Sequence, residues 1–264
     1  MIYFENMREE IIQQNHVYWQ NRASGYSEVN KEELSGVQRE TWTSFLTAEI
    51  DGQFPDRDRK EIKILDVGAG PGFISIILTE AGYDVTAFDF SESMLAEAKS
   101  NAKDLADVIT FIQGDAMNLP FKDKSFDVVF SRNLTWNLPD PKKAYRQWVR
   151  VLKPCGLMMV FDANWYTYLV DEAKKEEYNQ DRMNVAEEGL GDYNIGDNFD
   201  QMEDIARTMP MTEIIRPAWD QEFLQSLKAG RVSIKENVGE ILYSQKEKIN
   251  YKSTPLFMVK LVRE

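Results

Sequence analysis

Short apolar runs alternate with helical patterns through the middle of the chain. Each run is four to six residues long and mostly apolar, the length of a buried strand, and the runs cover residues 62–67, 85–88, 109–112, 126–130 and 157–161. Helical spacing of apolar positions fills the intervals, at residues 73–81, 91–103 and 141–152. Regular strand–helix alternation predicts an α/β fold with a doubly wound, mostly parallel sheet and right-handed crossovers.

Capping residues mark the end of the first helix and the starts of the second and third. Gly82 follows the first helix as a C-cap candidate, and Ser91 precedes the second as an N-cap candidate. Asp140 and Pro141 form a third start signal, with the acid at the cap and the proline in the first helical position. The helix boundaries are therefore predicted on chemical as well as periodic grounds.

Residues 1–50 have a different pattern and are predicted to form a helical N-terminal lid. Apolar and aromatic side chains recur at helical spacing in two groups, around Tyr18 and Trp19 and around Trp42 and Leu46. We expect the helix to break between the groups, at residues 21–26. Residues 51–60 are polar, contain Gly52 and Pro55, and predict a connector.

Residues 163–215 interrupt the α/β rhythm. They begin with aromatic residues and contain three glycines, and residues 166–213 hold 13 acidic and 4 basic side chains. An insertion of about 50 residues is too long for a plain loop and predicts an acidic helical cap. A helix at residues 220–228 and strands near 232–235 and 256–262 then resume the pattern, so residues 51–162 and 216–264 are predicted to form one α/β domain.

Composition narrows the range of functions. The chain has 264 residues and a formal charge of −13, which opposes a nucleic-acid substrate because phosphate binding needs a basic surface. One histidine and one cysteine leave no Cys/His metal cluster and no internal disulfide. No apolar run approaches the roughly 18 residues of a membrane span, and three glutamates among residues 1–10 are untypical of a signal peptide. We therefore expect a cytoplasmic protein that acts on a small molecule, without a metal and without a membrane partner.

A glycine-rich turn carries the strongest chemical signal. Residues 65–72 read Leu-Asp-Val-Gly-Ala-Gly-Pro-Gly and join the first predicted strand to the first predicted helix. Glycines allow such a turn to bring backbone N–H groups close to a ligand at the carboxyl end of the strand. A dinucleotide fingerprint would place its third glycine at position 73, where this chain has Phe73. The spacing instead resembles the first motif of class I S-adenosylmethionine-dependent methyltransferases.

Further motifs follow in the order of that family. Asp89 ends the second strand, 19 residues after Gly70, where a carboxylate can accept hydrogen bonds from two ribose hydroxyls. Residues 114–116 read Gly-Asp-Ala and resemble the adenine motif, residues 126–133 resemble the fourth strand and its loop, and residues 150–154 resemble the junction before the fifth strand. Position 155 departs from the family pattern, with Cys155 where a glycine is usual.

The resemblance implies a Rossmann-like sheet of seven strands, one of them antiparallel, and S-adenosyl-L-methionine as cofactor. It also implies a set of cofactor contacts along the strand ends and in the lid. These are Trp19, Arg22, Tyr26, Asp66, Gly68, Ala69, Gly70, Asp89, Phe90, Ser91, Met94, Gly114, Asp115, Ala116, Met117, Arg132 and Asn133. Arg22 is the candidate partner of the cofactor's carboxylate.

The methyl acceptor is expected beyond the fourth and fifth strands, because open α/β sheets bind ligands at the carboxyl ends of their strands. The candidate substrate residues there are Trp136, Asn137, Asp162, Asn164, Trp165 and Tyr166. We hypothesise that Trp136 and Trp165 wall the transfer site and that Asp162 or Asn164 orients a polar group. The acidic cap makes a cationic or amine-bearing acceptor a second hypothesis.

Three functional interpretations stay open at this point. The first is a small-molecule methyltransferase working by in-line displacement, with no catalytic acid or base assigned and the atom methylated unspecified. The second is a protein that binds the same cofactor without methylating, as a sensor or scaffold. The third, a nicotinamide-dependent oxidoreductase, is disfavoured by Phe73 and by the adenine motif at Asp115. Either a monomer or a homodimer is compatible with the sequence.

Overall fold

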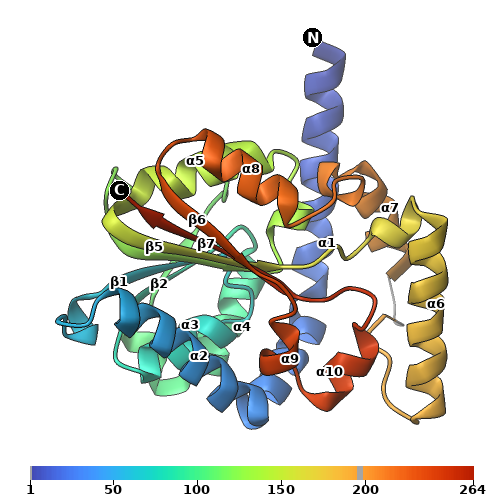
Figure 1. Ribbon diagram of the computed structural model, residues 1–264, viewed down its shortest axis with the longest axis horizontal. Helices are drawn as coiled ribbons and strands as arrows, with labels where there is room; N and C mark the ends of the chain where they lie inside the picture. The colour runs from blue at the N-terminus through green and yellow to red at the C-terminus, as the bar shows by residue number, and fades with distance from the viewer. Residues whose placement is uncertain (1, 195–198) are drawn as a thin grey trace.

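A seven-stranded sheet forms the centre of the molecule, with helices on both faces (Figure 1). The computed structural model describes residues 2–194 and 199–264, with side chains from residue 11 onward. The strand order is β3-β2-β1-β4-β5-β7-β6. The strands are β1 Lys63–Val67, β2 Asp84–Asp89, β3 Thr110–Gln113, β4 Phe126–Arg132, β5 Leu152–Asp162, β6 Gly230–Lys235 and β7 Phe257–Arg263.

Six strands run in one direction and β7 runs against them. β1 to β5 pair in parallel, whereas β7 pairs antiparallel with β5 on one side and with β6 on the other. The order reverses at β1, from which the chain proceeds to β2 and β3 on one side and to β4 and β5 on the other. This confirms the predicted doubly wound α/β fold with one antiparallel strand, and it places a crevice beside the end of β1.

The helices between the strands cover both faces of the sheet. Their bounds are α1 Ile2–Ser35, α2 Val37–Gln53, α3 Phe73–Glu80, α4 Glu92–Ala102, α5 Pro141–Val151, α6 Glu172–Glu187, α7 Phe199–Thr208, α8 Ala218–Ser226, α9 Gly239–Leu242 and α10 Gln245–Asn250. The short 3₁₀ helices are η1 Arg59–Glu61, η2 Lys103–Asp107, η3 Thr135–Asn137, η4 Thr167–Leu169 and η5 Pro210–Thr212. The predicted caps are present, since Ser91 and Asp140 accept hydrogen bonds from the first turns of α4 and α5.

Two apolar cores hold the helices to the sheet. On one face, Tyr145 and Trp148 of α5 and Leu224 of α8 pack on the strands. On the other face, Trp42 of α2 and Phe73 of α3 do the same. The central strands β1 and β4 between them are almost wholly buried, as expected for a parallel sheet covered on both sides.

The N-terminal segment differs from the sequence prediction. α1 is one continuous helix of 34 residues, and the break expected at residues 21–26 is wrong. Gly25 lies inside the helix, where tertiary contacts of its neighbours outweigh the intrinsic cost of a helical glycine of about 1 kcal/mol. The chain changes direction at Gly36 instead, between α1 and α2. In Figure 1 the first turns of α1 extend beyond the rest of the molecule.

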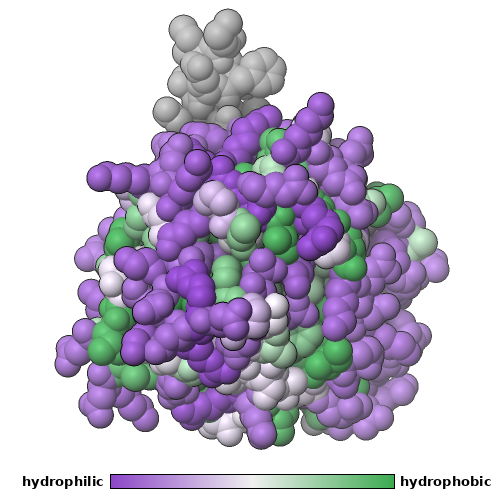
Figure 2. Space-filling model, turned by 60° about the vertical axis from the view of Figure 1, so that its left-hand side comes forward, coloured by the Kyte–Doolittle hydropathy of each residue, from purple (hydrophilic) through white to green (hydrophobic). Residues whose placement is uncertain are grey.

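Residues 163–194 and 199–215 include the helices η4, α6, α7 and η5, which lie beside the carboxyl end of the sheet (Figure 1). Met202 and Ile205 of α7 pack in an apolar cluster with Tyr18 of α1 and Trp136 of η3. The segment therefore contacts both the N-terminal helix and the loop after β4. On the face shown in Figure 2, hydrophilic residues dominate and hydrophobic ones are scattered among them. No helix in the described ranges is long and apolar enough to cross a bilayer.

Candidate functional site

A cavity lies at the carboxyl ends of the central strands, beneath α1. Its lining comes from α1, the turn after β1 and the strand ends and loops that follow β2, β3 and β4. The lining residues are Ile12, Asn15, Trp19, Tyr26, Gly68, Gly70, Phe88, Asp89, Phe90, Met94, Gly114, Asp115, Ala116, Met117, Arg132, Asn133, Leu134, Asn137, Leu138 and Pro139. The position matches the crevice that the reversal of strand order predicts.

The glycine-rich turn forms one wall of this cavity. The N–H groups of Gly68 and Ala69 donate to the carbonyl oxygen of Phe88, at 2.8 and 3.1 Å, and so tie the turn to β2. Gly68 and Gly70 adopt φ values of 74° and 52°, in the left-handed region that favours glycine. A Cβ on Gly70 would meet only the ring of Tyr26, at 3.8 Å. The missing side chain therefore leaves space between the turn and α1.

Asp89 connects that wall to the next strand. Its Oδ2 accepts from the N–H of Gly70 at 2.9 Å and its Oδ1 accepts from the N–H of Ser91 at 2.8 Å. Burial raises the pKa of this carboxyl above its ordinary value, while the backbone donors oppose the rise. Each oxygen can accept a second bond, so the carboxyl is held in place and still has lone pairs for a ligand.

The far end of the cavity is lined by the loop after β3 and the start of α4. Asp115 Oδ1 accepts from the N–H of Met117 at 2.8 Å, which fixes that loop. Phe90 and Met94 present an aromatic ring and a thioether from the opposite side. A flat apolar group with polar edges would fit between these walls.

Two polar atoms on the lining have no hydrogen-bond partner within the described part of the chain. They are the buried amide oxygens of Asn133 and Asn137. Asn137 is otherwise well held, since its Nδ2 donates to Asn15 Oδ1 at 3.2 Å and its carbonyl accepts from Asn15 Nδ2 at 3.1 Å. Both oxygens are buried from solvent, and buried acceptors without partners are costly.

α1 closes the cavity from above and is fixed by polar contacts. Gln20 Oε1 accepts from Ser91 Oγ at 2.7 Å and from the N–H of Ser93 at 2.8 Å, at the start of α4. Asn30 Oδ1 accepts from the N–H of Phe73 at 3.2 Å, at the start of α3. The helix thus caps two other helices while it covers the site.

Four of the predicted cofactor residues do not line the cavity. Arg22 hydrogen-bonds the hydroxyl of Tyr18. Asp66 lies below the turn, where Ser75 Oγ donates to its Oδ2 at 2.6 Å and burial raises its pKa to about 7. Ala69 and Ser91 contribute the backbone and capping contacts described above. The other 13 predicted residues are on the lining.

The predicted substrate residues are divided between the cavity and its surroundings. Asn137 is on the lining. Trp136 packs on Tyr166 with ring centres 4.8 Å apart, and Trp165 packs edge-on against Tyr251 at 5.1 Å. These aromatic rings lie beside the cavity, toward the cap.

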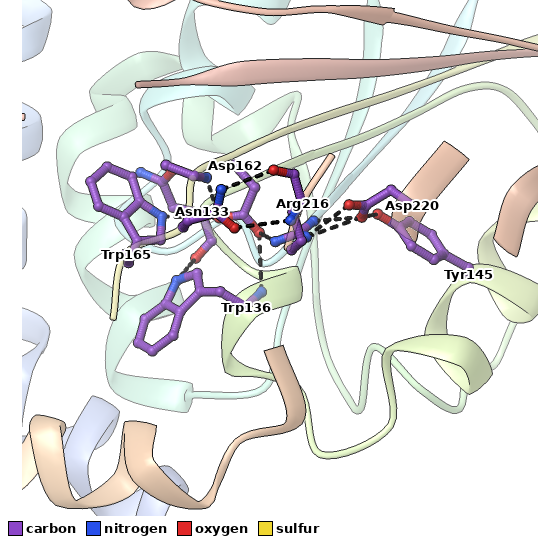
Figure 3. Close-up of polar contacts among 9 residues, drawn as sticks. Asn133, Trp136, Tyr145, Asp162, Trp165, Arg216 and Asp220 are labelled. Atoms are coloured by element: carbon purple, nitrogen blue, oxygen red, sulfur yellow. Dashed lines mark hydrogen bonds and ion pairs between the residues drawn. The ribbon is translucent and has the colours of Figure 1, made fainter. Parts of the chain in front are cut away.

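Asp162 and Asn164 have hydrogen-bond partners within the protein, and those of Asp162 are drawn in Figure 3. Asp162 is fully buried and pairs with Arg216, with 2.6 Å between its Oδ2 and Nη1 of the arginine. Asn164 donates to the carbonyl oxygen of Arg216 and accepts from its N–H, at 2.9 and 3.1 Å. Neither residue is on the lining of the cavity.

Sequence reasoning missed six lining residues. They are Ile12, Asn15, Phe88, Leu134, Leu138 and Pro139. Asn15 lies four residues before Trp19 and eleven before Tyr26, which puts all three on one helix face. A prediction of one continuous helix through residue 25 would have placed Asn15 on the same face as Trp19 and Tyr26. The predicted break at residues 21–26 removed that reason to include Asn15.

Residues 65–160 match the family model described as a methyltransferase domain. The chain is 38% identical over 141 residues to a demethylmenaquinone methyltransferase of Renibacterium salmoninarum, a match covering 53% of this chain and 55% of the relative. Its identity to a demethylmenaquinone methyltransferase of Staphylococcus epidermidis is 35% over 155 residues, or 58% and 61% of the two chains. The matches thus span little more than half the length of these relatives.

Solved structures share the fold. The plantazolicin methyltransferase, solved with a desmethyl analogue and S-adenosylhomocysteine, superposes with a TM-score of 0.61 at 13% identity, covering 98% of this chain and 99% of that one. A phosphoethanolamine N-methyltransferase of Haemonchus contortus, solved with S-adenosylmethionine, gives a TM-score of 0.53 at 17% identity, covering 89% and 60%. Together with the matched domain, these structures confirm the resemblance to class I methyltransferases in fold.

Proposed function

We propose that this protein, whose residues 65–160 match a methyltransferase domain within a class I methyltransferase fold, transfers a methyl group from S-adenosylmethionine to a small molecule. The observation that carries the proposal is the cavity with a glycine-rich turn on one wall, the carboxyl of Asp89 beside it, and the side chains of Asn133 and Asn137 on its lining. Hydrogen-bond acceptors dominate this constellation, which suits a ligand with an ammonium group and hydroxyls.

Each part of the lining has a matching part in the cofactor. Gly68, Gly70 and Asn133 would hold the amino-acid end. Asp89 would accept from the two ribose hydroxyls. Asp115 would accept from the adenine amine, with Phe90, Met94 and Met117 against the ring faces. When bound, the cofactor supplies a methyl group activated on a sulfonium.

The protein's own contribution is alignment and exclusion of water. α1 covers the cavity, and the cap packs against α1 through Tyr18 and Met202. Holding the acceptor in line with the methyl group in such a closed site can supply roughly 7–11 kcal/mol of the barrier. No side chain need act as an acid or base when the acceptor atom is already nucleophilic, and we assign none.

The acceptor would enter from the side of η3 and the cap, where Trp136, Trp165 and Tyr166 gather. Two acceptor classes have support. The names of the relatives point to a quinone-type molecule, which aromatic walls would suit. The acidic residues of α6 and α7 instead favour an amine or other cation drawn by their field.

Two measurements test the proposal. Calorimetric titration with S-adenosylhomocysteine and with NAD should give binding of the first alone. Incubation of the protein and deuteromethyl-labelled cofactor with a deproteinised cell extract should then yield a product heavier by the labelled methyl. Binding without product would favour a sensor or scaffold, and NAD binding would favour an oxidoreductase. The ionic-strength dependence of turnover would separate a cationic acceptor from a neutral one.

A further inference from the structure

We propose that Asp162 and Arg216 are positioning residues that fix the acceptor-side wall of the site, rather than groups that touch the acceptor. The inference rests on the proposed function, because it assigns that wall to the methyl acceptor. Both side chains are fully buried, and both stand where the cap joins the α/β domain. We call the pair, with Asp220, the clasp.

One carboxylate holds three separate segments. Asp162 Oδ2 accepts from the N–H of Trp136 at 3.0 Å and from Nη1 of Arg216 at 2.6 Å. Its Oδ1 accepts from the N–H of Ala163 and from the indole N–H of Trp165, both at 2.9 Å. The end of β5 is thereby linked to the loop after β4, to the start of the cap and to the end of the cap (Figure 3).

Arg216 completes the clasp on its other side. Its Nε and Nη2 donate to Asp220 at 2.9 and 2.7 Å, and Asp220 Oδ1 accepts from the hydroxyl of Tyr145 at 2.5 Å. The two hydrogen bonds between the side-chain amide of Asn164 and the backbone of Arg216 join the two stems of the cap, 52 residues apart. The cap is therefore anchored to β5, α5 and α8 at a single point.

Stability alone does not explain a fully buried clasp. Removing charges from water costs about as much as their attraction returns, so packed apolar side chains of similar size would hold the same space equally well. What charged hydrogen bonds add is direction, since each requires a donor at a fixed place and angle. The clasp fixes the backbone of Trp136 and the orientation of the Trp165 indole, and an apolar replacement would not.

One residue, Trp136, connects the clasp to the lining of the cavity. Trp136 is held at its backbone by Asp162, and its indole N–H donates to the carbonyl oxygen of Asn133 at 2.9 Å. Asn133 is on the cavity lining. A shift of Asp162 would therefore move the wall that carries Trp136 and Trp165, while the glycine-rich turn and Asp89 stay in place.

Asp162→Asn is the main test, because it keeps the size of the side chain and removes the charge that faces Arg216. Arg216→Lys keeps the charge and loses the fork of donors. Asp127→Asn is the matched control: Asp127 is also buried and pairs with Arg57 at 2.5 Å and Lys153 at 2.7 Å, but at the opposite end of the sheet.

Three readouts are compared across these proteins. The first is the affinity for S-adenosylhomocysteine, and the second is the fluorine spectrum of protein labelled with 5-fluorotryptophan, with Trp136 and Trp165 assigned by substitution to Phe. The third is the rate of S-adenosylhomocysteine formation at saturating S-adenosylmethionine over a dilution series of deproteinised cell extract, which gives a half-saturating extract concentration without identifying the acceptor.

We expect Asp162→Asn to shift or broaden the signals of Trp136 and Trp165 alone, to raise the half-saturating extract concentration at least tenfold, and to leave cofactor affinity within twofold. Arg216→Lys should give a smaller change in the same direction, about threefold, and decides the matter if Asp162→Asn does not fold. Asp127→Asn should change none of the three readouts.

The proposal is overturned if Asp162→Asn leaves both the two fluorine signals and the half-saturating concentration unchanged. It is equally overturned if cofactor affinity falls as much as acceptor use, because the effect would then be a general loss of structure. If the wild-type protein binds no S-adenosylhomocysteine, the proposed function fails instead, and the fluorine spectra still decide whether the clasp orients the tryptophans.

Discussion

Glu33, near the end of α1, forms a two-point ion pair with Arg132, at the end of β4. Nη1 of the arginine lies 2.8 Å from Oε1 and Nη2 lies 3.0 Å from Oε2. The guanidinium also lies over the rings of Trp42 and Phe73, at 5.1 and 5.0 Å from their centres. The helix that covers the cavity is thus joined by charge to the strand that lines it.

Breaking this pair should destabilise the protein strongly. Glu33→Ala leaves the Arg132 guanidinium buried without its carboxylate, which typically costs about 3–5 kcal/mol in the free energy of unfolding. Glu28→Ala is the control, since Glu28 pairs with Lys31 on the exposed face of the same helix and should cost under about 1 kcal/mol. Urea unfolding measures both. Equal losses in the two variants would contradict the role given to the pair.

Asp66 should make stability fall as pH rises. Its pKa is about 7 in the folded protein because it is buried, against about 3.9 in an unfolded chain. Between these values the folded state holds a proton that the unfolded state lacks, so raising the pH favours unfolding. The protonated carboxyl contributes on the order of 4 kcal/mol to the free energy of unfolding. This contribution is complete below pH 4 and is lost as the pH rises to 7 and above.

Asp66→Asn should remove this dependence. The difference in unfolding free energy between the variant and the wild type is measured from pH 5 to pH 8, which cancels the groups common to both. We expect the variant to gain on the wild type as pH rises. A difference that stays constant across this range would show that the carboxyl is ionised throughout.

Gly70→Ala should weaken cofactor binding. The left-handed φ of 52° strains any L side chain by about 1–2 kcal/mol, and the new Cβ would stand between the turn and Tyr26. Gly82→Ala carries the same backbone strain at φ 98°, outside the cavity. Both variants should lose thermal stability, but only Gly70→Ala should lose affinity for S-adenosylhomocysteine, by about tenfold or more. Similar affinities for the two would argue against the placement of the ligand at this turn.

Asp89→Asn should reduce affinity for the same ligand by about 10- to 100-fold, because hydrogen bonds to a charged acceptor contribute about 1.5–3 kcal/mol. Asp84→Asn is the control on the same strand, at its exposed start. Calorimetry measures both. Unchanged binding in Asp89→Asn would remove the ribose role from this residue.

The α/β domain could be predicted from the sequence because its signals are local. A run of apolar residues, a cap and a glycine turn fix β1, the turn at Gly68 and α3 within a few residues. The same holds for Asp89 and Asp115, whose places follow from the ends of their strands. Thirteen lining residues are in the set of cofactor contacts that the resemblance implies, and two of them, Trp19 and Tyr26, belong to α1.

Long-range contacts explain what the sequence could not show. Residues 21–26 predict a break, but Gln20, Ser27 and Asn30 each hydrogen-bond a distant segment and keep α1 continuous. Likewise Asp162 looks available at a strand end until Arg216, 54 residues later, is placed beside it. In both cases the partner is far away in the sequence, so the residues around the contact do not predict it.

The cover over the cavity is a single rod anchored by exchangeable polar links along its length, at Asn15, Gln20, Asn30 and Glu33. A rod of this kind cannot open locally as a loop does, and must lift or melt over several turns at once. Under the proposed function, any passage of cofactor past α1 depends on how often these polar links release together.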